Sequence, residues 1–303
     1  MTVPLVALGV PVQSFADAVE RAGGRVVPLA EADSLVWSAG TPAELRAVLR
    51  AHPGVRWVQL GAAGVDGYHD DGVLAAGPVF TSAKGAYARP VAEHALALTL
   101  ACLRELPRRA KAATWETQSG RMLYGSEVLI VGGGGIAREF ARLIEPFGCR
   151  ITVVRRSSEP FPGAARTIGI DGLVDAAAET DVLVVAAALT EQTRGLVGDE
   201  VLRRLRPHSV LVNVARGAIV DTQALVRELR AGTFAAAGLD VTEPEPLPDG
   251  HPLWALPNVL VTPHTADTPD MIEALLAVRI EQNVRALAAG EPLTGVVDAR
   301  LGY

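Results

Sequence analysis

Three reactive side chains each follow an apolar segment in the last third of the chain. Arg216 comes after "LVNVA" and before a glycine, Glu245 lies among prolines in "TEPEPLP", and His264 follows "VLVTP". Because the carboxyl ends of parallel strands gather at one edge of an open sheet, where ligands bind, we expect the three to form one site. Taken singly, each residue has an ordinary alternative role. The arginine could form an ion pair in a loop, the glutamate could be solvated, and the histidine could be a turn residue whose hydrogen bonds are satisfied.

Together the three groups suit hydride transfer to a 2-keto acid. A charged His264 can donate a proton to the developing alkoxide, and Glu245 beside it would hold the ring and favour its charged form. Arg216 can clamp a carboxylate and polarise the neighbouring carbonyl. The sequence therefore predicts His264 as the proton donor, Glu245 as its partner and Arg216 as a substrate-binding residue.

A glycine-rich turn lies between an apolar segment and a helical pattern. In "VLIVGGGGIAREF", Gly132, Gly134 and Ala137 fit the frame G-x-G-x-x-A. The first glycine permits a tight turn, the second lets the backbone approach a pyrophosphate, and the third small residue allows close packing of helix on strand. A glycine run alone can be only a loop, but this context between strand and helix favours dinucleotide binding.

The next apolar segment ends in cations. An acid about 20 residues after the glycines would bind the adenosine ribose of NAD. Here "RITVVRRSSE" (150–159) places Arg155, Arg156, Ser157 and Ser158 at that point. Guanidinium groups match phosphate oxygens, so the segment predicts NADP(H) as the preferred cofactor, with NAD(H) possible. The alternative is a solvated strand end in a chain in which nearly every cation is an arginine.

These groups need a scaffold of parallel strands. Apolar runs alternate with helical stretches from "VPLVALG" onward, which indicates βαβ units. From a long helix at 89–113 to about residue 267, the runs are almost wholly apolar, as in a parallel sheet covered on both faces. We expect helix N-caps at Ser14 and Thr41 and a final helix at 269–290. The predicted fold class is α/β, with two doubly wound parallel sheets.

Length and composition limit the function class. A chain of 303 residues, 49% hydrophobic and 20% charged, suits two domains with a sizeable core. The net charge of -6 argues against nucleic acid or an anionic membrane as a partner. No stretch is long and apolar enough to span a membrane, and positions 1–10 lack a secretory signal pattern, so we expect a cytoplasmic protein. The apolar surroundings of Cys102 and Cys149 predict buried, reduced thiols, and no metal site is expected.

The motifs together resemble those of the D-isomer-specific 2-hydroxyacid dehydrogenases. That family's order and spacing are matched over nearly the whole chain by "GAAGVDGY", "VAEHALAL", "VGGGGIA", "LTEQTRGLVGDEVLRRLRPHSVLVNVARGAIVD", "LDVTEPEPLP" and "NVLVTPHTA". "LVWS", "HPLW" and the ending "GVVDARLGY" are similar to the NADPH-dependent glyoxylate/hydroxypyruvate reductases. The resemblance implies a Rossmann domain (95–267) inserted in a flavodoxin-like substrate domain (1–94 and 268–303), and a homodimer.

The resemblance also implies roles for single residues. Arg216, Glu245 and His264 would be the catalytic set, and the backbone at Ala63, Gly64 and Val65 would bind the substrate carboxylate. We expect Asp240, although grouped with the cofactor site, to anchor the Glu245 loop by hydrogen bonds, and His94 to be a satisfied, partly buried histidine. The residues expected to bind cofactor are Gly132, Gly134, Gly135, Ile136, Arg155, Arg156, Ser157, Ala187, Ala215 and Asp240.

Three segments depart from the family pattern. Ala188 replaces the usual proline before "LT", which leaves the cofactor contacts of that loop open. The short "TWETQSGRMLYGSEV" lacks the commoner glycine spacing, which leaves the dimer-embracing region open. In "TSAKGAYARP", Lys84, Tyr87 and Arg89 suit either an anion pocket for a larger acidic substrate or an exposed loop.

The sequence therefore predicts an NADPH-preferring reductase of small 2-keto acids, with glyoxylate or hydroxypyruvate first among them. Two alternatives remain. A dinucleotide-sensing interaction protein without turnover would need only the cofactor pocket. A dehydrogenase of a phosphorylated hydroxyacid is supported only by the cationic loop at 84–89.

Overall fold

The computed structural model describes residues 3–157 and 159–300. The chain divides into two compact units: unit 1 comprises Met1–Tyr87 and Thr268–Tyr303, and unit 2 comprises Ala88–Asp267. The domain boundary expected between residues 94 and 95 lies inside a helix of unit 2, Ala88–Leu103, whereas the units divide before that helix begins.

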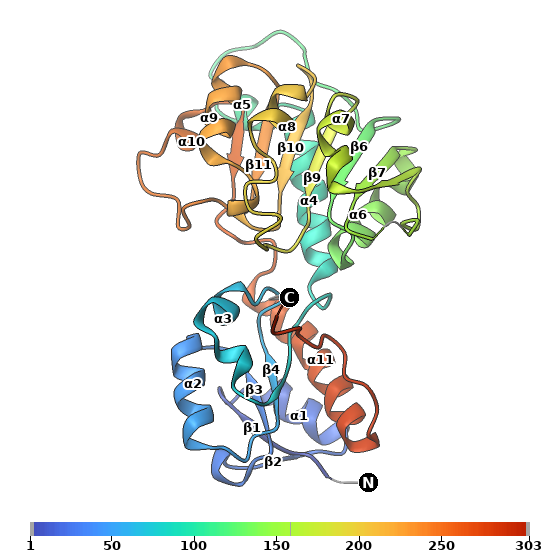
Figure 1. The fold of residues 1–303 in the computed structure, drawn as a ribbon. Helices are drawn as coiled ribbons and strands as arrows, with labels where there is room; N and C mark the ends of the chain where they lie inside the picture. The colour runs from blue at the N-terminus through green and yellow to red at the C-terminus, as the bar shows by residue number, and fades with distance from the viewer. Residues whose placement is uncertain (1–2, 158, 301–303) are drawn as a thin grey trace. The chain divides into compact units, whose positions relative to one another are not determined.

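Unit 1 contains a five-stranded parallel sheet of order β2-β1-β3-β4-β5 (Figure 1). This is the flavodoxin-like order expected from the sequence. Helices α1 and α11 pack side by side next to the sheet. The strands are β1 Leu5–Leu8, β2 Arg25–Val26, β3 Ser34–Trp37, β4 Trp57–Leu60 and β5 Val79–Thr81; the helices are α1 Gln13–Arg21, α2 Pro42–Ala51, α3 Asp66–Asp71 and α11 Pro269–Ala289, with 3-10 turns at Leu29–Glu31 and Val73–Ala75.

Local sequence signals explain two of the helix ends in unit 1, the start of α2 and the end of α11. The Thr41 side chain accepts the Glu44 amide while the Glu44 carboxylate accepts the Thr41 amide, a capping box that fixes the start of α2. The expected cap at Ser14 is wrong: α1 begins at Gln13 after Val12, and the Ser14 hydroxyl instead donates to Glu273 at 2.7 Å. Helix α11 ends as expected, with left-handed Gly290 after Ala289.

Unit 2 contains a seven-stranded parallel sheet of order β12-β11-β10-β9-β6-β7-β8. Counted from β6, this order contains the 3-2-1-4-5-6 order of a Rossmann fold. The strands are β6 Glu127–Val131, β7 Arg150–Val154, β8 Arg166–Ile168, β9 Val182–Val185, β10 Val210–Asn213, β11 Ala236–Leu239 and β12 Val259–Val261; the helices are α4 Ala88–Leu103, α5 Leu106–Arg109, α6 Gly135–Ile144, α7 Leu173–Ala177, α8 Asp199–Arg204, α9 Thr222–Ala231 and α10 Pro252–Ala255, with 3-10 turns at Glu145–Phe147, Ile170–Gly172 and Gly217–Ile219.

The core of unit 2 follows from its apolar strands. The residues of β9 are all buried, as are those of β10 and β11, because helices cover both faces of the sheet. Helix α4 packs against α6 and against β10 and β11. This packing leaves the loops after the strands to carry polar groups.

The prediction of a single long helix at 89–113 is wrong. Helix α4 ends at Leu103, Glu105 has a left-handed backbone (φ 55°), and the short α5 follows. The chain returns at Arg121, whose amide donates to the Leu103 carbonyl at 2.8 Å. The last turn of α4 is thus completed by a distant segment rather than by the next helical turn.

Both cysteines are free thiols, as expected, but only Cys102 is buried, whereas Cys149 is partly exposed. Burial raises the pKa of Cys102 to about 12, and it also raises the pKa of the half-buried Cys149. Among the helices of the described residues, none combines the length and apolarity needed to cross a membrane.

Candidate functional site

The turn that carries Arg216 is built on the end of β10. Asn213, the last residue of that strand, is buried; its side chain donates to the Arg216 carbonyl at 2.9 Å and accepts the Ala215 amide at 3.1 Å. The Arg216 guanidinium is half-buried and donates to the Ala215 carbonyl at 2.8 Å. Asn213 therefore fixes the backbone from which Arg216 extends.

Gly217 brings this turn into direct contact with the loop that carries Glu245. A Cβ at position 217 would lie 1.9 Å from the carbonyl carbon of Thr242, so only glycine fits. The Thr222 hydroxyl also donates to the Glu243 carbonyl at 2.8 Å. Backbone packing thus places Arg216 beside the Glu245 loop, a role of Gly217 that no motif in the sequence indicates.

His264 and Glu245 form a direct pair. The His264 Nδ1 lies 2.6 Å from Glu245 Oε1, with side chains that are 44% and 38% exposed. The other carboxylate oxygen, Oε2, accepts the Thr242 amide at 3.4 Å. An ionised Glu245 accepts the proton of Nδ1, which leaves Nε2 as the nitrogen that can exchange a proton with a ligand.

The backbone of His264 is held in a sparsely populated conformation. Its φ is +49°, which is uncommon for a residue other than glycine. Its amide donates to the Asp240 carbonyl at 2.8 Å and to the Thr262 carbonyl at 3.0 Å. These hydrogen bonds stabilise the strained backbone conformation, which directs the imidazole ring toward Glu245.

The Asp240 carboxylate is the centre of this turn. It accepts the Thr262 hydroxyl at 2.6 Å and the amides of Thr265 and Ala266 at 2.9 and 3.1 Å. Asp240 was expected to anchor the Glu245 loop; these bonds instead hold the residues around His264. The reason is register: β11 and β12 are paired, so the end of β11 faces the segment after β12.

His94 completes the network around Asp240. Its Nε2 lies 2.9 Å from the Thr262 hydroxyl and 3.3 Å from Asp240, and it is partly buried, as expected. Burial raises the pKa of the Asp240 carboxyl, but the bonds from His94, Thr262 and Thr265 oppose it and leave the pKa below its ordinary value. Asp240 is therefore an ionised structural anchor.

Asp267 is a titratable group that sequence reasoning missed. Burial raises the pKa of its carboxyl, Asp240 raises it further, and the charges of His264 and Arg216 oppose the rise. It directly follows the segment held by Asp240, yet no motif in the sequence distinguishes it from an ordinary loop acid.

The glycine turn (132–136) has the geometry for a bound pyrophosphate. Gly132 has a φ of +113°, and a Cβ there would lie 2.5 Å from the Ala186 carbonyl oxygen. At Gly134, by contrast, a Cβ would meet nothing within 4 Å, so the surface before α6 is open. Gly135 and Ile136 begin α6, whose amino end favours anions. These residues fit a dinucleotide.

The cationic strand end lies against this turn. A Cβ on Gly133 would be 3.0 Å from Cδ of Arg155, so the arginine side chain packs against Gly133. Arg156 is exposed, and the Ser157 hydroxyl accepts the Glu159 amide at 3.3 Å. Ser158, which the sequence places at the same strand end, lies outside the described residues.

Two further residues expected to bind cofactor, Ala187 and Ala215, follow the ends of β9 and β10. The Ala187 amide lies 2.7 Å from the Cβ position of Gly132, and Ala215 is buried in the core next to Arg216. At Ala188, the site of the missing proline, the carbonyl accepts the Thr193 hydroxyl at 2.7 Å. A hydrogen-bonded turn thus constrains the loop that proline would have stiffened.

The expected carboxylate-binding segment belongs to unit 1. Ala63 and Gly64 follow β4 and are at least partly exposed, whereas Val65 is buried. In the neighbouring loop Lys84 is exposed, but Tyr87 is buried and its hydroxyl donates to the Gly61 carbonyl at 2.6 Å. Tyr87 is thus part of the scaffold and not part of an exposed anion pocket.

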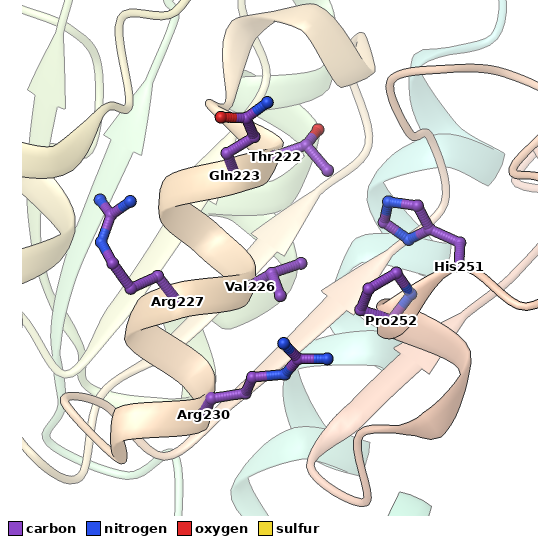
Figure 2. A pocket seen from close by; sticks show the side chains of 7 residues that line it. All are labelled: Thr222, Gln223, Val226, Arg227, Arg230, His251 and Pro252. Atoms are coloured by element: carbon purple, nitrogen blue, oxygen red, sulfur yellow. The ribbon is translucent and has the colours of Figure 1, made fainter.

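A hollow of about 400 Å³ lies elsewhere in unit 2, between α9 and the start of α10 (Figure 2). The guanidinium of Arg230 extends across it toward Pro252, whereas Arg227 points away and pairs with Asp199. None of the described residues that line it was expected in the site. Those lining residues are Thr222, Gln223, Val226, Arg227, Arg230, His251 and Pro252.

The chain is similar to a known protein family and to known protein sequences. Residues 95–266 match the model of the D-isomer specific 2-hydroxyacid dehydrogenase, NAD binding domain. A glyoxylate reductase of Korarchaeum cryptofilum is 32% identical over 80% of this chain and 76% of its own. A D-3-phosphoglycerate dehydrogenase of Mycobacterium bovis is 33% identical over 86% of this chain, which spans only 50% of that longer relative.

Two solved structures are similar to this chain over its whole length. A D-isomer specific 2-hydroxyacid dehydrogenase from Xanthobacter autotrophicus, in complex with NADPH and MES, has a TM-score of 0.84 and 30% identity and covers 100% of both chains. An NADPH-dependent glyoxylate/hydroxypyruvate reductase from Sinorhizobium meliloti, in complex with NADP and sulfate, has a TM-score of 0.83 and 26% identity over 100% of both chains.

Proposed function

Because this chain belongs to the D-isomer specific 2-hydroxyacid dehydrogenase family, we propose that it reduces small 2-keto acids, glyoxylate or hydroxypyruvate first among them, to 2-hydroxy acids. The observation that carries the proposal is the His264–Glu245 pair at 2.6 Å, held beside Arg216 by the contact of Gly217 with Thr242. All of these groups belong to the same unit as the glycine turn.

The proposed cofactor is NADP(H), with NAD(H) accepted less well. Arg155 lies over the glycine turn where an acid would favour NAD, and a guanidinium there favours a 2′-phosphate. The NADPH in the Xanthobacter relative and the NADP in the Sinorhizobium relative support this choice. Arg156 and Ser157 would add further contacts to the same phosphate.

When bound, NADPH supplies the hydride that adds to the keto carbon. In the proposed mechanism Nε2 of His264 donates a proton to the carbonyl oxygen, and Glu245 stabilises the imidazolium through Nδ1. Arg216 binds the substrate carboxylate and polarises the carbonyl. The amides of Ala63, Gly64 and Val65 are also proposed to bind the substrate carboxylate. Asp240 keeps the His264 turn in place.

A second candidate is a dehydrogenase of a phosphorylated hydroxyacid. It is favoured by the exposed Lys84 and by the similarity to a D-3-phosphoglycerate dehydrogenase. A dinucleotide sensor is disfavoured, because a sensor has no need of a histidine held at φ +49° against a carboxylate.

The test is turnover with NADPH and NADH, side by side, on a panel of 2-keto acids that includes a phosphorylated one. We expect turnover with NADPH and a higher kcat/KM than with NADH. His264→Ala should lower kcat by about 10²–10⁴-fold and leave NADPH binding nearly unchanged. His208→Ala, in the same unit but paired with Asp181, is the matched control. If the wild-type protein turned over none of these acids, the proposal would be refuted.

The proposal includes a cytoplasmic enzyme that acts as a homodimer. Both features follow from the sequence pattern and the family resemblance. Light scattering of the purified protein tests the second: we expect twice the chain mass of 31.7 kDa, and the mass of a single chain would contradict it.

A further inference from the structure

Unit 1 holds a buried arginine that the proposed mechanism does not use. Arg279 lies in α11, is 6% exposed, and donates from Nη1 to the Ser82 carbonyl at 2.8 Å and from Nη2 to the Lys84 carbonyl at 3.0 Å. Its Nε has no hydrogen-bond partner among the described residues. No ion pair of Arg279 is found within that part of the chain; two carbonyl groups accept its hydrogen bonds, and Tyr87 nearby favours its charge.

This arrangement is costly in free energy. Burial lowers the pKa of Arg279, which shows that its surroundings disfavour a charge. Apolar side chains of similar volume are often as stabilising as a buried ion, and an unsatisfied buried donor is rare. Stability of α11 alone therefore does not explain why an arginine stands here.

The two carbonyl groups belong to a loop clamped from a second side. The Ser82 amide donates to the Gly295 carbonyl at 2.8 Å, and Thr81 and Val296 form an antiparallel bridge. Gly295 has a φ of +78°, and a Cβ there would lie 2.5 Å from the Ser82 carbonyl oxygen and 2.6 Å from Nη1 of Arg279. The guanidinium, the loop and the 295–297 segment are therefore packed without space between them.

The same loop holds the segment proposed to bind the substrate carboxylate. The Ala83 amide donates to the Ala62 carbonyl at 2.9 Å, and the buried Tyr87 hydroxyl donates to the Gly61 carbonyl at 2.6 Å. Residues 61–65 and 82–87 follow the neighbouring strands β4 and β5, so both lie at one edge of the unit 1 sheet. A shift of either loop therefore moves the other.

We propose that Arg279 is a positioning residue for substrate binding: it fixes the 82–87 loop and, through it, the amides of Ala63, Gly64 and Val65. This inference rests on the proposed function of those amides. The two donated hydrogen bonds set the position of the 82–87 loop. Arg279 touches neither substrate nor cofactor in this role.

The test compares Arg279→Met and Arg279→Lys with Arg285→Met. Arg285 lies on the same helix but is exposed and pairs with Glu281, so it is a matched control. We expect the Met variant to raise the KM for glyoxylate and the Kd for oxalate by about tenfold or more, because both charge-assisted bonds are lost. The Lys variant should show a smaller rise in KM and Kd. In both Arg279 variants kcat and the Kd for NADPH should stay within about twofold of wild type.

Oxalate binding, measured by calorimetry, gives a readout that does not depend on turnover. If Arg279→Met does not fold, Arg279→Lys decides: a rise of about threefold or more in both KM and Kd is expected, which corresponds to the loss of one weak hydrogen bond. Wild-type values of KM and Kd in Arg279→Lys, or an equal loss of kcat and of NADPH binding, would overturn the inference. Absence of any turnover by the wild-type protein would instead refute the proposed function.

Discussion

Replacing Gly217 by alanine should separate the Arg216 turn from the loop that carries Glu245. The added Cβ would lie 1.9 Å from backbone atoms of Thr242, whereas ordinary contact begins at 3.4 Å. One backbone must therefore move by about 1.5 Å, because the obstructing atoms do not belong to a flexible side chain. Misplacement of about 1 Å can cost roughly 100-fold in rate, so we expect kcat to fall by about that factor or more.

The assay is steady-state oxidation of NADPH with glyoxylate, together with NADPH binding. Binding should stay within about twofold of wild type, since the glycine turn at 132–136 follows a different strand. Gly54→Ala is the matched control, because a Cβ on Gly54 meets nothing within 4 Å. That variant should keep both values.

A folded Gly217→Ala protein with wild-type kcat would refute the reasoning, since the loops would then tolerate separation. Loss of NADPH binding in parallel with kcat would refute it as well, because the damage would extend beyond the contact of the two loops. Thermal unfolding of both variants shows whether each is folded at the assay temperature.

The remaining predictions concern the cofactor, the His264 pair and the turn that holds it. Arg155→Asp should weaken NADPH binding at least about tenfold more than NADH binding. Arg150→Asp, at the opposite end of β7, is the control. Equal effects of Arg155→Asp on both cofactors would show that Arg155 is only a solvated residue at the strand end. Glu245→Gln should lower kcat by about 10²-fold with little change in NADPH binding; unchanged kcat would remove Glu245 from the mechanism. Asp240→Asn should lower the free energy of unfolding by about 2–4 kcal/mol near pH 7, measured in urea. Because the pKa of Asp240 is below its ordinary 3.8 in the folded chain, its contribution is complete above that value and is lost as the pH falls through the folded pKa. The difference between wild type and variant should thus shrink in acid, and a constant difference would contradict this assignment.

The strands and the glycine turn were predictable because their signals are local. Apolar runs such as Val182–Val185 identify a strand buried on both faces, and glycines between a strand and a helix leave few alternatives. The edge strands β2 and β8 have two and three residues, too short for any periodic signal. The break at Glu105 was not predictable either, because the partner of the α4 end, Arg121, is distant in sequence.

The proposed catalytic set can be named from residue type and position in the sequence, but the contacts that hold these residues in place cannot. Arg216, Glu245 and His264 follow successive strands, and topology alone places such residues at one edge. The space that excludes a Cβ at Gly217 depends on the path of residues 242–243, which no pattern in the sequence describes. The partners of Asp240 depend likewise on the register of β11 with β12, and the buried Arg279 resembled any other helical arginine.

The most direct test of the central claim is isotope transfer. NADPH carrying deuterium in its transferable position is incubated with the protein and hydroxypyruvate, and the product is analysed by mass spectrometry and chiral chromatography. We expect one deuterium at C2 of a D-2-hydroxy acid, and about 10²–10⁴-fold slower labelling with His264→Ala. An unlabelled product, or the L-isomer, would contradict the account.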